Sequence, residues 1–167
     1  LHPQFGAKGH FRRLIWTQKN LPELLKKYDA KFLLSPLPEA PIFRGIRSIV
    51  LAHDLLPLRY PKLSPLLAYH LAYVPLVLHN SERVLCNSEA TAREIHEILH
   101  VPLKKIVTIP LGFNKSSIYP MKLKRKSFFL VLGRHDPHKN IARTLKAFAM
   151  IPNKEFHLFI VGPQDRR

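Results

Sequence analysis

Short apolar runs of strand length alternate along the chain with stretches in which apolar residues recur at helical spacing. In the first two thirds of the chain, the expected strands are 31–34, 48–53, 83–87 and 106–109, and the expected helices are 12–28, 63–78 and 89–99. Pro22 is expected to divide the first helix or start a second one, and Pro75 to kink the long apolar helix or end it early. Regular alternation of strands and helices predicts an α/β fold with parallel sheets and right-handed crossovers.

The last third of the chain repeats this pattern after a polar and basic segment. Here the run 128–132 is expected to be a strand, 141–148 an amphipathic helix and 157–161 a second strand. Two Rossmann-like domains of this kind are expected to face each other across a cleft and to bind ligands beyond the carboxyl ends of their strands. The predicted division is a first domain at 1–114, a linker at 115–127 and the beginning of a second domain at 128–167.

The segment GRHDPHKN, residues 133–140, joins the first strand of the second domain to its helix. Asn140 is a natural N-cap for that helix, which places Arg134 and Lys139 beside its first turn. Free backbone N–H groups and the helix dipole favour an anion at such a position, and two cations suit a diphosphate. The alternative interpretation is a solvated basic loop.

Four segments, in this order and spacing, resemble motifs of the family 4 glycosyltransferases, which are retaining enzymes of the GT-B fold. They are LAHDLLPLRYP at 51–61, RVLCNSEATAREI at 83–95, KKIVTIPLGF at 104–113 and GRHDPHKN at 133–140. The resemblance implies a GT-B type protein with two Rossmann-like domains, the second only partly present. It also implies transfer of a sugar from a UDP- or GDP-linked donor to a sugar or lipid-linked acceptor, as in polysaccharide biosynthesis.

The resemblance also implies roles for particular residues. Gly133, Arg134 and Lys139 are expected to bind the donor diphosphate. His53, the first polar residue after its strand, is expected to contact sugar hydroxyls near the reacting centre. The alternative for His53 is a structural hydrogen bond to a neighbouring backbone carbonyl. Because the leaving phosphate is pictured as helping to remove the acceptor proton in this family, no protein nucleophile is assigned.

Supporting roles are assigned to Asp54, Gly112 and Asn140. Asp54 is expected either to cap the following turn or to orient His53. Gly112 is interpreted either as a flexible or positive-φ position where the chain leaves the first domain, or as a simple turn at a strand end.

Two features of the family pattern are missing from the sequence. These are the Gly-rich loop after the first strand of the acceptor domain and the Glu-x7-Glu segment that contacts the donor sugar and ribose. The chain also starts at Leu1 without an initiator Met. It is therefore expected to be a fragment that is inactive on its own, and its donor sugar, nucleotide base and acceptor stay open.

Charge widens the choice of partners without deciding it. The chain carries 27 Lys and Arg against 11 Asp and Glu, a net charge of +16. Such an excess attracts nucleotides, nucleic acids and anionic lipids alike. The alternatives to an enzyme are a basic nucleic-acid-binding module, which lacks any recognisable motif, and a non-catalytic remnant of the same fold. We expect no specific nucleic acid, and a cytoplasmic protein that can contact the anionic membrane face peripherally.

Two sequence features bear on metals and cysteine chemistry. His96, Glu97 and His100 match the HExxH pattern of zinc proteases, but they lie at the end of a helix where histidine is favoured by the dipole alone, and no third-ligand signature follows. A single cysteine, Cys86, allows neither an internal disulfide nor a cysteine-cluster site and is expected to be a buried thiol. No metal or other cofactor is expected, and no apolar run reaches the roughly 18 residues of a membrane span.

Overall fold

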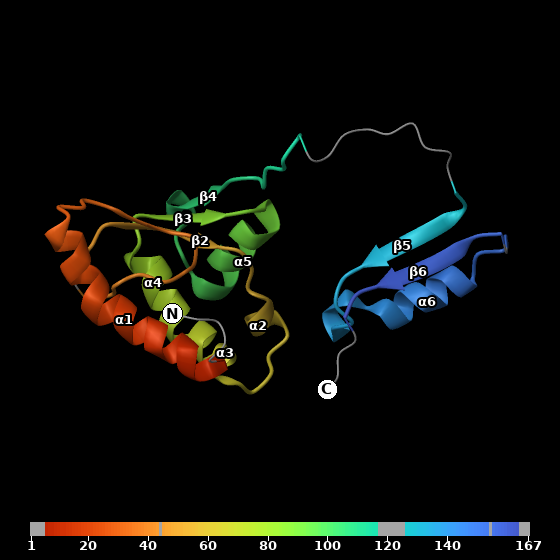
Figure 1. Cartoon of the computed structure of the whole chain (residues 1–167), viewed down its shortest axis with the longest axis horizontal. Coiled ribbons are helices and arrows are strands. Elements are labelled where there is room, and N and C mark those ends of the chain that lie inside the picture. The colour runs from red at the N-terminus through yellow and green to blue at the C-terminus, as the bar shows by residue number, and fades with distance from the viewer. Residues whose placement is uncertain (1–5, 44, 117–125, 154, 164–167) are drawn as a thin grey trace. The chain divides into compact units, whose positions relative to one another are not determined.

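Two sets of parallel strands organise the chain, one in each of its two units, Leu1–Phe113 and Asn114–Arg167 (Figure 1). The computed structural model describes residues 6–43, 45–116, 126–153 and 155–163. Most of the predicted linker, 117–125, lies outside the described residues. Within the described part of the chain, no helix combines the length and the apolar character needed to cross a membrane.

Unit 1 contains a four-stranded parallel sheet in the order β1–β2–β3–β4. Its strands are β1 Leu33–Ser35, β2 Ser48–Ala52, β3 Arg83–Cys86 and β4 Ile106–Thr108. Val50 of β2 pairs with Val84 of β3, and both are fully buried. The parallel ladders confirm the predicted α/β fold.

Helices supply the rest of the unit 1 core. They are α1 Gly6–Lys27, α2 Leu56–Arg59, α3 Pro65–Ala68, the π-helix Tyr69–Tyr73, α4 Val74–Asn80 and α5 Glu89–Leu99, with a 3₁₀ turn at Leu103–Lys105. Val77 and Leu78 of α4, together with Ile95 of α5, are buried with the strand residues. The thiol of Cys86 belongs to the same core, as expected from its apolar neighbours.

Two proline predictions need correction. Pro22 does not divide the first helix, since α1 runs through it and buries the ring. For Pro75, the expected early end of the apolar helix is wrong, and the alternative of a kink stays a prediction. The π-helix precedes this proline, and the N–H of Val74 donates to the carbonyl of Tyr69, five residues earlier. A π turn absorbs the register change near a proline that cannot donate to the helical ladder, so the helical segment continues to Asn80.

Unit 2 is built from two strands and one α-helix among its described residues. β5 Phe128–Leu132 and β6 His157–Val161 pair in parallel, and α6 Ile141–Ala149 connects them. Aromatic contacts join the three elements: the ring centroids of Phe129 and Phe148 lie 6.0 Å apart, and those of Phe128 and Phe159 lie 5.5 Å apart.

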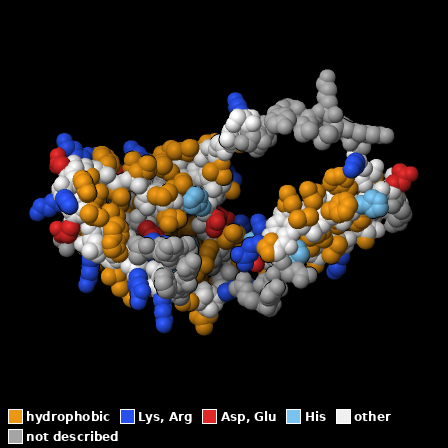
Figure 2. Space-filling view, in the orientation of Figure 1, with side chains coloured by type: hydrophobic (Ala, Val, Ile, Leu, Met, Phe, Trp, Pro, Cys, Tyr) orange, Lys and Arg blue, Asp and Glu red, His pale blue; other side chains and the backbone are white. Residues whose placement is uncertain are grey.

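Apolar surface is exposed across unit 2. No described residue from 126 to 163 is buried. Figure 2 shows hydrophobic side chains gathered over β5 and β6, where Leu130 is 50% exposed and Phe159 is 52% exposed. Because stability depends on apolar area removed from water, unit 2 has a much smaller source of stability than unit 1.

We therefore predict different protection of the two units in hydrogen exchange. Amides of β2 and β3 are expected to exchange by global unfolding of unit 1. Amides of β5 and β6 are expected to exchange through local opening with a much smaller free energy. Residue-resolved exchange measured by NMR on the whole chain tests this. Equal protection of the β2–β3 and β5–β6 ladders would contradict it.

Candidate active site

His53 directly follows β2, at the carboxyl edge of the unit 1 sheet. Its side chain is exposed, and its Nε2 lies 3.1 Å from the carbonyl oxygen of Pro36. Since a carbonyl can only accept, Nε2 carries the proton and Nδ1 of the neutral ring is left as an acceptor. The backbone is held as well, because the Thr91 hydroxyl of α5 donates to the carbonyl of His53 at 3.4 Å. The structure thus shows the carbonyl contact that was the alternative interpretation of this histidine, and contact with a sugar stays a prediction.

Asp54 is part of the turn that follows. Its Oδ1 accepts a hydrogen bond of 3.0 Å from the backbone N–H of Leu56, the first residue of α2. Of the two roles expected for Asp54, the structure shows the capping one. The short helix α2 itself was not predicted, since the segment LLPLRYP reads as a turn.

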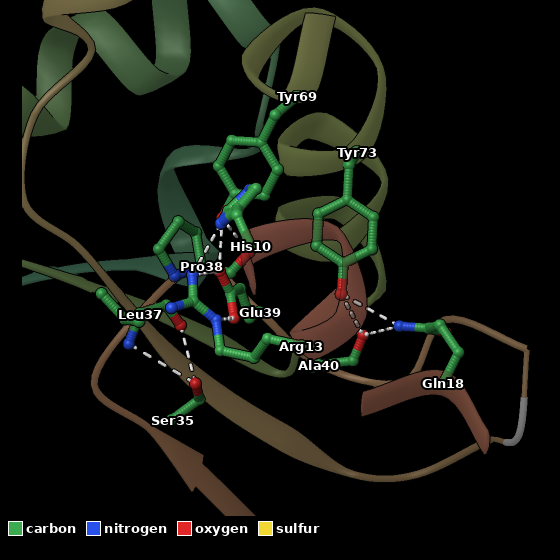
Figure 3. A network of polar contacts seen from close by, with 10 residues as sticks. All are labelled: His10, Arg13, Gln18, Ser35, Leu37, Pro38, Glu39, Ala40, Tyr69 and Tyr73. Atoms are coloured by element: carbon green, nitrogen blue, oxygen red, sulfur yellow. Dashed lines mark hydrogen bonds and ion pairs between the residues drawn. The ribbon is translucent and has the colours of Figure 1, made fainter. Parts of the chain in front are cut away.

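The loop after β1 carries Pro36 and therefore determines where the His53 ring is held. The carbonyl oxygens of Leu37, Pro38 and Ala40 in this loop each lie within hydrogen-bond distance of a side-chain donor (Figure 3). The Ser35 hydroxyl donates to the carbonyl of Leu37 at 2.8 Å, and the Tyr69 hydroxyl lies 3.4 Å from the carbonyl of Pro38.

Gln18 of α1 fixes the far end of this loop. Its Nε2 donates to the carbonyl of Ala40 at 2.9 Å, and its Oε1 accepts from the N–H of Ile42 at 2.9 Å. The Tyr73 hydroxyl donates to the same Ala40 carbonyl at 3.0 Å. Burial, followed by the negative charge of Glu39, raises the pKa of Tyr73 to about 12, so the hydroxyl keeps its proton.

A charged pair lies at the centre of this network. Glu39 is 7% exposed, and Arg13 of α1 donates to both of its carboxylate oxygens, from Nη2 at 2.6 Å and from Nε at 2.8 Å. The bond to Glu39 raises the pKa of Arg13. Burial, with the charge of Glu39 second, raises the pKa of Tyr69, whose hydroxyl lies 3.3 Å from the Glu39 carboxylate.

His10 completes the network on the α1 side. Its Nδ1 lies 2.8 Å from Nη2 of Arg13, and because a guanidinium can only donate, Nδ1 accepts and Nε2 carries the proton. Burial, followed by the charge of Arg13, lowers the pKa of His10. Nε2 is buried without a hydrogen-bond partner among the described atoms.

Sequence analysis missed this network. Glu39 is the only acid in the segment SPLPEAPI, 35–42, and an isolated charge among apolar and proline residues was the available signal that it would need a buried partner. Arg13 could not be chosen as that partner, because 26 residues separate the two in the chain.

The second group of predicted site residues lies in the loop after β5. Gly133 has φ 146°, in the region that favours glycine, and its N–H donates to the carbonyl of Val161 at 3.0 Å. Arg134 is 62% exposed, and its Nε lies 3.1 Å from Oδ2 of Asp136. Lys139 is exposed at the end of a 3₁₀ turn. The sequence analysis interpreted this loop from its cations alone, and the structure shows that an acid, Asp136, pairs with Arg134.

Two supporting predictions are corrected here. Asn140 occupies the N-cap position of α6, as predicted, but it has the left-handed conformation, with φ 56°, and its side chain makes no capping hydrogen bond. A left-handed turn out of the preceding 3₁₀ turn therefore sets the helix start. Gly112 does not have positive φ, and a methyl group at that position would meet no atom within 4 Å. The interpretation of Gly112 as a positive-φ position is wrong.

The HExxH segment does not present its two histidines on one helical face. His96 lies on α5, and its Nδ1 is 2.9 Å from the carbonyl of Val101. His100 lies beyond the last helical residue, with φ 55°. Across the described ranges, no group of three or more His, Cys, Asp or Glu residues is placed to hold a metal ion.

Comparison with models of known families identifies the first unit. The family model described as Glycosyltransferase Family 4 matches residues 2–117, which is more than half of the chain and includes β1 to β4 with His53. No curated protein matches the chain.

The Arg13–Glu39 pair generates a prediction about stability. Arg13→Ala should lower the free energy of unfolding of unit 1 by about 2–3 kcal/mol, because it leaves the Glu39 carboxylate buried without its partner. The neighbouring and exposed Arg12 offers the matched control, and Arg12→Ala should change stability by less than about 0.5 kcal/mol. Urea unfolding followed by the fluorescence of Trp16, the single tryptophan, measures both. Equal effects of the two substitutions would show that the pair is not an anchor.

Proposed function

Since the chain belongs to glycosyltransferase family 4, we propose that it forms part of a retaining glycosyltransferase that takes its sugar from a nucleotide-sugar donor. The observation that carries this proposal within unit 2 is the loop 133–140, which leaves the carboxyl end of a parallel strand and leads into an α-helix. Ligands of parallel α/β sheets bind at this edge, and helix N-termini favour anions.

The donor diphosphate is assigned to Gly133, Arg134 and Lys139. Both cationic side chains are exposed, so a ligand can reach them. In the structure, the guanidinium of Arg134 pairs with the carboxylate of Asp136. A diphosphate carries more charge and more acceptor oxygens than this carboxylate, and we propose that it takes over the guanidinium when it binds.

His53 is assigned to the donor sugar. Its ring donates through Nε2 to Pro36 and presents Nδ1 as an acceptor, which suits a sugar hydroxyl as donor. The anchored loop 36–42 and the Thr91 contact hold the ring and its backbone in one place. Such fixed positioning is what a residue next to a reacting centre needs.

The proposed reaction needs no nucleophile from the protein. The bond between the anomeric carbon and the phosphate oxygen breaks, the acceptor oxygen bonds to the same face of that carbon, and the departing phosphate takes the acceptor proton. Arg134 and Lys139 would neutralise the charge that develops on the leaving diphosphate. With two cations in this role we propose no metal cofactor.

The acceptor and the location of the protein are proposed from the family and from the net charge. A sugar or lipid-linked acceptor would bind to unit 1, and the net charge of +16 would favour contact with an anionic, cytoplasmic membrane face. The same charge is the only feature that favours a nucleic-acid partner. Charge alone does not distinguish a membrane surface from a nucleic acid.

The diphosphate assignment predicts a selective loss of nucleotide binding. Replacing Arg134 and Lys139 together by Ala should weaken UDP or GDP binding at least tenfold, since each lost charged partner costs about 1.5–3 kcal/mol. The melting temperature should hardly change, because both side chains are exposed. Titration calorimetry measures the affinity, with Lys146→Ala on the exposed side of α6 as control. Unchanged affinity in the double variant would refute the assignment.

The His53 assignment predicts the opposite pattern. In a form of the protein that carries a complete donor-side domain, His53→Ala should reduce kcat strongly and leave nucleotide affinity nearly unchanged, because His53 contacts the sugar and not the phosphates. Steady-state kinetics together with nucleotide binding separate the two effects, and His157→Ala in unit 2 serves as control. Wild-type turnover would restrict His53 to its structural bond with Pro36.

A further inference from the structure

Two glycines meet where the paired strands of unit 2 end. Gly133 follows β5 and Gly162 follows β6, and the last residues of the two strands, Leu132 and Val161, are partners in the ladder. The N–H of Gly133 donates to the carbonyl of Val161 at 3.0 Å, which extends the pairing by one step into the loop.

Backbone packs directly against backbone at this point. A Cβ atom on Gly162 would overlap the carbonyl oxygen of Gly133 and lie 2.6 Å from its carbonyl carbon and 3.5 Å from the backbone nitrogen of Arg134. These atoms belong to the peptide group that joins Gly133 to Arg134. No side chain fits at position 162 unless this peptide group moves.

The two glycines are needed for different reasons. Gly133 has φ 146°, which side chains rarely adopt, yet the space around its missing Cβ is open. At Gly162, the neighbouring backbone atoms leave no room for a Cβ atom. Gly133 therefore provides the conformation of the turn, and Gly162 provides the room in which the turn lies.

We infer that Gly162 is a positioning residue for the diphosphate loop, acting through the Gly133–Arg134 peptide group. This inference rests on the proposed function of Arg134. The peptide group is the first link of the loop, so its position sets where the Arg134 side chain starts and how its guanidinium meets Asp136. A displaced peptide group would leave both cations in the protein but separate them from the geometry that a diphosphate requires.

The test uses the whole chain and NMR, which detects weak binding. Amide resonances of Gly133, Arg134 and Lys139 are recorded without ligand and during titration with pyrophosphate and with UDP. Gly162→Ala should move the Gly133 and Arg134 resonances before any ligand is added and weaken pyrophosphate binding roughly tenfold or more. Ala149→Ser, which adds one atom at an exposed helix end in the same unit, should do neither.

A double-variant cycle separates positioning from a general structural effect. If Gly162 acts through Arg134, then Gly162→Ala should cause little further loss of pyrophosphate affinity in an Arg134→Ala background. Additive losses would overturn the inference, and so would unchanged Gly133 and Arg134 resonances in Gly162→Ala. Collapse of the unit 2 resonances to those of an unfolded chain would overturn it as well, because Gly162 would then be a folding requirement and not a positioning residue.

Failure of the proposed function gives a different result. Wild-type protein whose loop resonances respond neither to pyrophosphate nor to UDP would refute the diphosphate assignment itself. The ligand-free shifts in Gly162→Ala would still report whether Gly162 fixes the turn.

Discussion

The bidentate pair between Arg13 and Glu39 is the contact on which the surroundings of His53 depend. Burial of a carboxylate that is 7% exposed costs free energy unless a cation and hydrogen-bond donors replace its lost water, and Arg13 supplies both in one planar group. The pair ties helix α1 to the loop after β1. That loop in turn presents the Pro36 carbonyl to the His53 ring.

Proline chemistry explains why this loop can be anchored by side chains. Pro36, Pro38 and Pro41 carry no N–H, so the loop has few donors to satisfy and several carbonyls to bind. Tyr69 and Tyr73, one helical turn apart on the π-helix segment, direct their hydroxyls toward carbonyls of this loop (Figure 3). The side-chain amide of Gln18 donates to the loop from α1. The π turn before Pro75 thus belongs to the same arrangement that holds the loop, and π turns are often found at functional places.

The two candidate sites are held by different physical means. In unit 1, a buried ion pair and side-chain hydrogen bonds fix the loop next to His53. In unit 2, where no described residue is buried, the loop with Arg134 is fixed by backbone contacts between two glycines at the ends of paired strands. Parallel pairing places each loop at the carboxyl end of its strand, the edge at which such folds bind ligands.

Local sequence patterns determined much of this protein. The helix predicted at 89–99 is α5, and the strand predicted at 128–132 is β5, because periodicity and capping act between near neighbours such as Ser88 and Thr91. The parallel α/β fold followed from the same periodicity, and the family followed from the resemblance of four motif segments. Only the tertiary structure decided that Pro22 stays inside α1, that Asp136 pairs with Arg134, that Arg13 neutralises Glu39 and that Gly162 lies against Gly133. The Arg13–Glu39 and Gly133–Gly162 contacts join residues far apart in the chain, and their energies depend on distances and burial that exist only once the chain has folded.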